Sequence, residues 1–129
     1  MGEASDAAEV LVLDDDGLTR DLMLSIIDRE GLEGYSGADG YEGLEYVEDR
    51  GLPDGMIVDR DMPGMRGEEF LLELEGDESH DLDSVEIWVY SSYPEERKVD
   101  GVDPGWREVY DRYFKKNHDS IRELLHEKF

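Results

Sequence analysis

The chain has 129 residues, of which 36 are Asp or Glu and 13 are Lys or Arg, so its formal net charge is −23 at pH 7. This length, with 38% hydrophobic residues, fits one packed globular domain. A sequence without cysteine excludes disulfides and thiolate metal sites, and the acidic balance excludes direct nucleic-acid binding, which needs a cationic surface.

The first half of the chain alternates strand-like and helix-like segments. Residues 9–13 form a short apolar run, typical of a strand buried on both faces, and residues 32–38 and 55–59 are predicted as further strands. Two helices are predicted between them. The first has Leu18, Leu22, Ile26 and Ile27 on one side and ends at Gly31, and the second is spaced by Tyr41, Leu44 and Val47.

The second half continues this alternation with one irregular stretch. Strands are predicted at 84–92 and 111–115, and helices around Phe70, Leu71 and Leu74 and around Ile121, Leu124, Leu125 and Phe129. The stretch 93–110 lacks a long amphipathic pattern. A short helix is predicted there, with Asp103 as its cap and Pro104 as its first residue. Val109 is expected in the core, and Trp106 is left open between core and partner surface.

Five strands that alternate with helices predict an α/β fold with a doubly wound, five-stranded parallel sheet covered on both faces. We expect a single domain over residues 1–129, with residues 1–8 as a flexible N-terminus. The N-terminus lacks the pattern of a signal peptide, and no apolar run approaches the ~20 residues of a membrane helix. The expected location is therefore the cytoplasm, with no membrane contact.

Polar residues follow the strands at the edge where parallel sheets place their sites. They are Asp14, Asp15 and Asp16 after the first strand, Asp59 after the third, Ser91 and Ser92 in the fourth, and Lys115 and Lys116 after the fifth. Converging carboxylates are suited to Mg²⁺, and a carboxylate beside the cation can attack a phosphoryl group. A hydroxyl and an ammonium can then bind the phosphoryl oxygens. Each residue alone is also typical of a turn, a cap or an exposed surface; their joint placement favours a site.

One family that fits part of this pattern is the haloacid-dehalogenase-type phosphatases. Residues 14–19, D-D-D-G-L-T, match their D-x-D-G-x-T loop. The resemblance implies that Asp14 is a nucleophile and Asp16 a general acid. Only Asp119 and Glu123 stand where that family has a later acidic pair.

A resemblance over essentially the whole chain is to the response-regulator receiver domain. Residues 10–32 resemble its first strand, acidic pair and first helix. Its phosphorylation loop, D-x-x-M-P-x-M-x-G, is matched at Asp59, Met62, Pro63, Met65 and Gly67. "IWVYSS" and "DRYFKK" resemble its fourth and fifth strands, which end in a hydroxyl residue and a lysine. This resemblance implies a flavodoxin-like sheet of strand order 2-1-3-4-5.

The receiver resemblance also implies a role for each site residue. Asp59 accepts the phosphoryl group, and Asp14, Asp15, Asp59 and the backbone carbonyl of Asp61 hold Mg²⁺, with Mn²⁺ as an alternative. Lys116 pairs with the phosphoryl oxygens. Ser91 hydrogen-bonds the phosphate, and Tyr113 rotates with it as the aromatic switch. Asn117 replaces the usual proline after the lysine, and a trans bond is predicted there because a cis bond without proline costs about 2.5–4 kcal/mol.

The implied partners are a sensor histidine kinase or a histidine phosphotransfer protein and a downstream target protein. The target would read the surface over helix 4, strand 5 and helix 5, and homodimerisation through that surface is left open. A degenerate receiver that acts only as a binding module is a third alternative, beside the receiver and the phosphatase. The acid excess is spread along the chain and resembles the surfaces of proteins from halophiles, which predicts stabilisation by salt.

Overall fold

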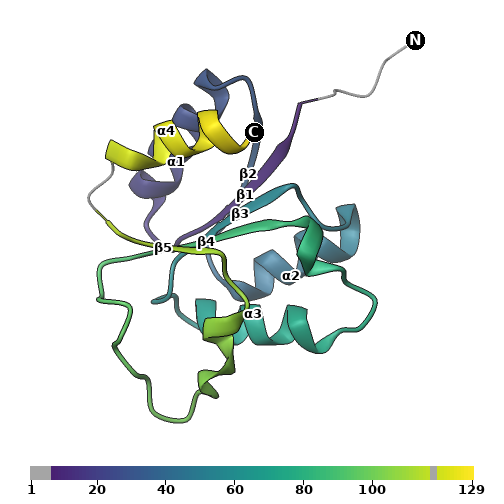
Figure 1. Cartoon of the computed structure of the whole chain (residues 1–129), viewed down its shortest axis with the longest axis vertical. Helices are drawn as coiled ribbons and strands as arrows, with labels where there is room; N and C mark the ends of the chain where they lie inside the picture. Colours follow the sequence, from purple (N-terminus) through teal and green to yellow (C-terminus); the bar gives the residue numbers. More distant parts are fainter. Residues whose placement is uncertain (1–6, 117–118) are drawn as a thin grey trace.

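The computed structural model describes residues 7–116 and 119–129. Its centre is a parallel sheet of order β2-β1-β3-β4-β5, with helices on both faces (Figure 1). The strands are β1 (Glu9–Leu13), β2 (Glu33–Gly37), β3 (Gly55–Val58), β4 (Glu86–Ser91) and β5 (Arg112–Lys115). The predicted fold class and strand order are confirmed, and the strand ends differ from the predicted ends by at most two residues.

Two helices cover each face of the sheet. The helices are α1 (Gly17–Arg29), α2 (Gly40–Arg50), α3 (Gly67–Gly76) and α4 (Asp119–Lys128), with the 3₁₀ turns η1 (Leu82–Ser84) and η2 (Pro104–Glu108). Alternate residues of the strands face opposite sides: Val10 and Val12 pack with α1 and α4, whereas Leu11 and Leu13 pack with α2 and α3. Figure 1 shows the same two layers on either side of the sheet.

The buried face of α1 agrees with the prediction only in part: Ile27 is buried and Ile26 packs against the same core, but the other two predicted residues do not. Leu18 and Leu22 are 81% and 55% exposed, whereas Met23 and Ile27 are 3% and 0% exposed. Each helical residue turns by about 100°, so Met23 and Ile27 define a stripe on a different side from Leu18 and Leu22. The apolar residues of this helix fall on two neighbouring sides, and the side that contains Met23 and Ile27 is the one that packs against the sheet.

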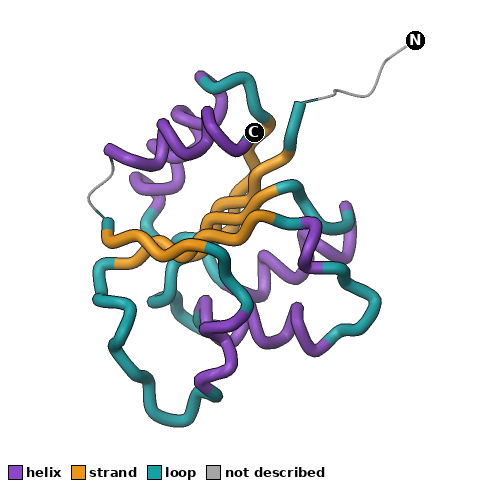
Figure 2. The backbone as a smooth tube through the Cα atoms, viewed as in Figure 1, coloured by secondary structure: helices purple, strands orange, loops and turns teal. Residues whose placement is uncertain are grey.

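The connection between β4 and β5 is long and contains only one short helical turn, η2 (Figure 2). The predicted cap is confirmed: Asp103 accepts a hydrogen bond from the backbone N–H of Gly105, and Pro104 begins the turn. Trp106 is 4% exposed and belongs to the core beneath α3. Val109 is partly buried against the same core, as expected.

The ends of the described chain pack on the face that α1 covers. Ile121 and Leu125 are buried there, and Phe129 packs beside them, as predicted. Ala8 also packs against this cluster, so it does not belong to a free N-terminal tail. Residues 1–6 and Asn117 lie outside the described residues. Among the helices that are described, none has the length and apolar character to cross a membrane.

Candidate functional site

The site residues continue the hydrogen-bond ladder of the sheet beyond its strands. The backbone N–H of Asp59 donates to the carbonyl of Leu13 at 2.8 Å, and that of Lys116 donates to the carbonyl of Ser91 at 2.8 Å. Because these residues extend regular strands, their backbones are fixed by the sheet. The carboxyl ends of β1, β3, β4 and β5 therefore meet at one edge, as the sequence predicts.

Three carboxylates converge at this edge. Oxygen atoms of Asp14, Asp15 and Asp59 all lie within 4.8 Å of one another. Asp14 and Asp59 are only 2% and 4% exposed, whereas Asp15 is exposed. Clustered carboxylates repel one another, and burial makes this more unfavourable. A hard divalent cation with oxygen ligands would neutralise this charge, so the donor set fits Mg²⁺.

Lys116 supplies the positive charge next to the two buried carboxylates. Its ammonium Nζ lies 2.8 Å from Asp14 Oδ2 and 3.2 Å from Asp59 Oδ2. Burial raises the pKa of Asp59 to about 6; the Lys116 ammonium opposes this effect and Asp14 adds to it. Burial acts to lower the pKa of Lys116, but the hydrogen bond to Asp14 and the attraction of both carboxylates leave it above its usual value.

A cavity of about 210 Å³ opens onto these groups. Asp59 lies on its wall, but Asp14 does not. Both oxygens of Asp14 are already engaged, one by the backbone N–H of Asp16 at 2.9 Å and the other by Lys116. A small ligand in the cavity would therefore meet Asp59 before Asp14. The wall is formed by Asp15, Asp59, Asp61, Ser91, Ser92, Tyr93 and Lys116.

The residue Asp16, which the phosphatase resemblance makes a general acid, has a structural role instead. It is the N-cap of α1, where its carboxylate accepts hydrogen bonds from Leu18 N at 3.2 Å and Thr19 Oγ1 at 2.8 Å. The hydrogen bond from Thr19 and then that from Leu18 lower its pKa, so this side chain is held as an anion. Among the described residues it is not part of the acidic cluster.

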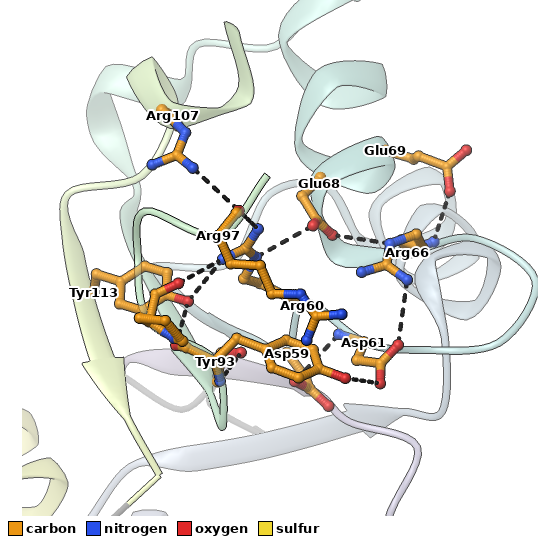
Figure 3. A network of polar contacts seen from close by, with 12 residues as sticks. Asp59, Arg60, Asp61, Arg66, Glu68, Glu69, Tyr93, Arg97, Arg107 and Tyr113 are labelled. Atoms are coloured by element: carbon orange, nitrogen blue, oxygen red, sulfur yellow. Dashed lines mark hydrogen bonds and ion pairs between the residues drawn. The ribbon is translucent and has the colours of Figure 1, made fainter. Parts of the chain in front are cut away.

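Ser91 and Tyr113 are linked through Tyr93. The fully buried Ser91 hydroxyl accepts a hydrogen bond from the Tyr93 N–H at 3.1 Å. The Tyr113 hydroxyl donates to the Tyr93 carbonyl at 2.8 Å. The Tyr93 hydroxyl in turn donates to the side chain of Asp61 at 2.9 Å, beside Asp59 (Figure 3). One tyrosine thus connects the end of β4, the loop after β3 and strand β5.

The loop after β3 explains why its motif ends in glycine. A Cβ atom on Gly67 would lie 2.1 Å from the carbonyl oxygen of Asp59. The N–H of Gly67 also donates to the carbonyl of Arg60 at 3.2 Å. Helix α3 therefore begins directly against the backbone of Asp59, a contact that a larger side chain would block.

The sequence interpretation missed Arg60 and Glu68, two fully buried residues next to the site (Figure 3). Arg60 Nε lies 3.2 Å from Glu68 Oε2. Charged residues eight positions apart resemble ordinary surface residues in the sequence. The available signal was strand alternation, because Arg60 follows Val58 by two positions and so points to the side of α3.

Comparisons with known proteins agree with this geometry. Residues 10–123 match the family model described as the response regulator receiver domain. No curated protein matches the chain. Among solved structures, the chain is similar to a CheY-like receiver domain from Methylobacillus flagellatus, with 16% identity, TM-score 0.77, and 96% and 100% of the two chains covered. It is also similar to the response regulator protein TrrA from Thermotoga maritima in complex with Mg²⁺-BeF, with 25% identity, TM-score 0.75, and 95% and 99% covered.

Proposed function

The chain belongs to the response regulator receiver domain family of two-component signalling, and we propose that it accepts a phosphoryl group on Asp59 from a phosphohistidine. The donor would be a sensor histidine kinase or a histidine phosphotransfer protein. The observation that carries the proposal is the arrangement of Asp59 on the cavity wall, with Lys116 Nζ 3.2 Å from its carboxylate and Asp14 and Asp15 beside it.

In the proposed reaction a carboxylate oxygen of Asp59 attacks the phosphorus atom, the bond from phosphorus to the imidazole nitrogen breaks, and the imidazole leaves with the electron pair. Asp59 must be ionised to attack, and with a pKa of about 6 it is mostly a carboxylate at neutral pH. Lys116 is positioned to stabilise the negative charge on the phosphoryl oxygens. The protein would thereby catalyse its own modification, and the same site would hydrolyse the acyl phosphate.

The metal of this proposal would be held by Asp14, Asp15, Asp59 and the backbone carbonyl of Asp61. Mg²⁺, or Mn²⁺ in its place, would neutralise charge on the carboxylates and on the phosphoryl oxygens. The acidic cluster supports this assignment. The Mg²⁺-BeF bound to the similar TrrA protein supports the same chemistry for this chain.

The response to phosphorylation is proposed as a shift between two populations. A phosphoryl group on Asp59 would attract the Ser91 hydroxyl, and Ser91 is already coupled to Tyr113 through Tyr93. The family's surface over helix 4, strand 5 and helix 5 corresponds here to η2, β5 and α4. Because η2 has only five residues, the described structure has no full helix 4 at that surface. A downstream protein, or a second copy, would read this surface.

The test is to treat the protein with Mg²⁺ and acetyl phosphate and to locate the adduct by mass spectrometry. Modification of Asp59, lost in Asp59→Asn, is the expected result. Modification of Asp14, or steady turnover of p-nitrophenyl phosphate, would instead identify a phosphatase. A protein that takes no phosphoryl group at saturating donor would be a receiver that acts only as a binding module.

A further inference from the structure

Arg60 is a buried cation directly after Asp59. It is 1% exposed, and its side chain lies between α3 and the connection from β4 to β5 (Figure 3). A buried charge is unfavourable unless it is paired and hydrogen-bonded. The partners of Arg60 therefore indicate which parts of the molecule it holds together.

On one side, Arg60 pairs with α3. Its Nε lies 3.2 Å from Oε2 of Glu68, a residue in the first turn of α3 that is 0% exposed. The second oxygen of Glu68 faces Arg66 Nε at 3.5 Å. The pair is thus fixed to the helix that begins against the backbone of Asp59.

On the other side, the same guanidinium holds the β4–β5 connection and strand β5. Nη1 donates to the carbonyl of Pro94 and to the hydroxyl of Tyr113, each at 3.1 Å, and Nη2 donates to the carbonyl of Arg97. Its carbon Cζ lies 4.7 Å from the centre of the Trp106 ring. One side chain therefore contacts the start, the middle and the end of this part of the chain.

The connection needs such a donor because it has little regular structure. Backbone carbonyls that are removed from water must find donors, and a helix would supply them from its own N–H groups. Here η2 covers only Pro104–Glu108. Arginine offers five N–H donors in a planar fork, which satisfies two carbonyls, the Tyr113 hydroxyl and Glu68 together.

We infer that Arg60 is a positioning residue that ties the β4–β5 connection to the Asp59 loop, so that the state of Asp59 is transmitted through this tie to η2 and Tyr113. The inference rests on the proposed phosphorylation of Asp59. Arg60 does not touch the cavity. It acts through the Tyr113 hydroxyl, which donates to the Tyr93 carbonyl, and through the carbonyls of Pro94 and Arg97, which follow Tyr93 in the chain.

The test compares amide hydrogen exchange of residues 93–107 in three proteins, with and without Mg²⁺ and beryllofluoride. The first is the wild type. The second is Arg60→Met with Glu68→Gln, which removes both charges together and so leaves no unpaired buried ion. The third is Arg107→Met, a matched control, because Arg107 also contacts the Arg97 carbonyl, at 3.2 Å, and the Trp106 ring, at 5.1 Å, but from a less buried position. If the double variant does not fold, Arg60→Lys takes its place, because lysine keeps the buried positive charge but lacks the planar guanidinium fork.

In the unmodified state, exchange over 93–107 is expected to be at least about tenfold faster in the double variant and nearly unchanged in Arg107→Met. On beryllofluoride binding, exchange over 93–107 is expected to change in the wild type and in the control. The double variant should bind beryllofluoride without that change.

Two results would overturn the inference separately from the proposed function. Unaltered exchange in the unmodified double variant would show that Arg60 does not hold the connection, whatever happens at Asp59. An equal response to beryllofluoride in the wild type and the double variant would show that the signal does not pass through Arg60. A wild-type protein that binds no beryllofluoride would overturn the proposed function itself, and the transmission with it.

Discussion

The ammonium of Lys116 lies closer to Asp14 than to Asp59, at 2.8 Å against 3.2 Å. Its positive charge therefore lies next to both buried carboxylates, which are also two of the proposed metal ligands. A cation that enters the cluster must compete with this ammonium for both of them. In the proposed reaction the same lysine would also bind the phosphoryl oxygens, so experiment can separate its effect on metal binding from its effect on phosphorylation.

Lys116→Met is expected to bind Mg²⁺ at least about tenfold more tightly than the wild type, because a unit positive charge a few ångströms from the metal is removed. The labelling of Asp59 by acetyl phosphate should nevertheless become slower. Isothermal titration calorimetry measures the first effect and mass spectrometry the second. Lys115→Met is the matched control, since Lys115 is exposed, and it should leave both quantities near those of the wild type. Weaker Mg²⁺ binding in Lys116→Met would contradict this reading of the site.

Asp15→Asn is expected to weaken Mg²⁺ binding by at least about tenfold, because Asp15 is one of the three clustered carboxylates. Asp16→Asn, its neighbour, should retain the wild-type affinity. Asn is itself a good N-cap, so the start of α1 should also be preserved in that variant. Calorimetric titration of both variants with Mg²⁺ at the same pH measures the two affinities and compares them with that of the wild type. Equal losses in the two variants would mean that general charge, and not a defined ligand set, governs metal binding.

Asp59→Asn should stabilise the metal-free protein at pH 7.5 by about 1–3 kcal/mol. The folded-state pKa of Asp59 is raised to about 6 from an ordinary value of 3.8, so the fold disfavours the ionised form. This penalty is absent below about pH 3.8, grows as pH rises, and is complete above about pH 6. Asparagine removes it.

Urea unfolding in the presence of EDTA, at pH 4 and at pH 7.5, tests whether Asp59→Asn is more stable than the wild type and whether the difference depends on pH. The difference between Asp59→Asn and the wild type should be small at pH 4 and large at pH 7.5. Asp61→Asn is the control, because the Asp61 side chain is 55% exposed and its pair with Arg66 lies at the surface. An Asp59→Asn protein less stable than the wild type at pH 7.5 would refute the argument.

Gly67→Ala is expected to destabilise the protein by about 2 kcal/mol or more, because the new Cβ would lie 2.1 Å from the Asp59 carbonyl oxygen and backbone would have to move. Gly76→Ala at the other end of α3 is the matched control. A Cβ there meets nothing within 4 Å, so alanine should stabilise the helix by up to about 1 kcal/mol. Urea unfolding of the two variants measures the contrast, and similar effects would contradict the close contact.

The sequence predicts the sheet and the positions of the site because both depend on strong local signals. The strands are short apolar runs, and the polar residues at their ends must meet once the strands are parallel. The buried side of α1 is predicted only in part: Ile26 and Ile27 pack as expected, but Met23 is buried in place of Leu18 and Leu22, and only packing against the sheet decides between these apolar residues. Strand alternation indicates the side to which Arg60 points, but its partners could not be predicted, because they lie 8 to 53 positions away along the chain.

The net charge of −23 leads to a last prediction, which concerns salt. With 36 acidic residues against 13 basic ones, most carboxylates have no cation to pair with, and their repulsion favours the unfolded chain. At 1 M salt the screening length falls to about 3 Å, so this repulsion should largely vanish. The thermal midpoint in molar KCl is therefore expected to exceed that in dilute buffer by roughly 5–10 °C. Sucrose at the same osmolality controls for effects other than screening and should raise the midpoint less. An unchanged midpoint in KCl would refute the hypothesis of a salt-adapted surface. It would leave the proposed phosphorylation of Asp59 untouched, because that proposal depends on Asp59 and Lys116 and not on the exposed acids.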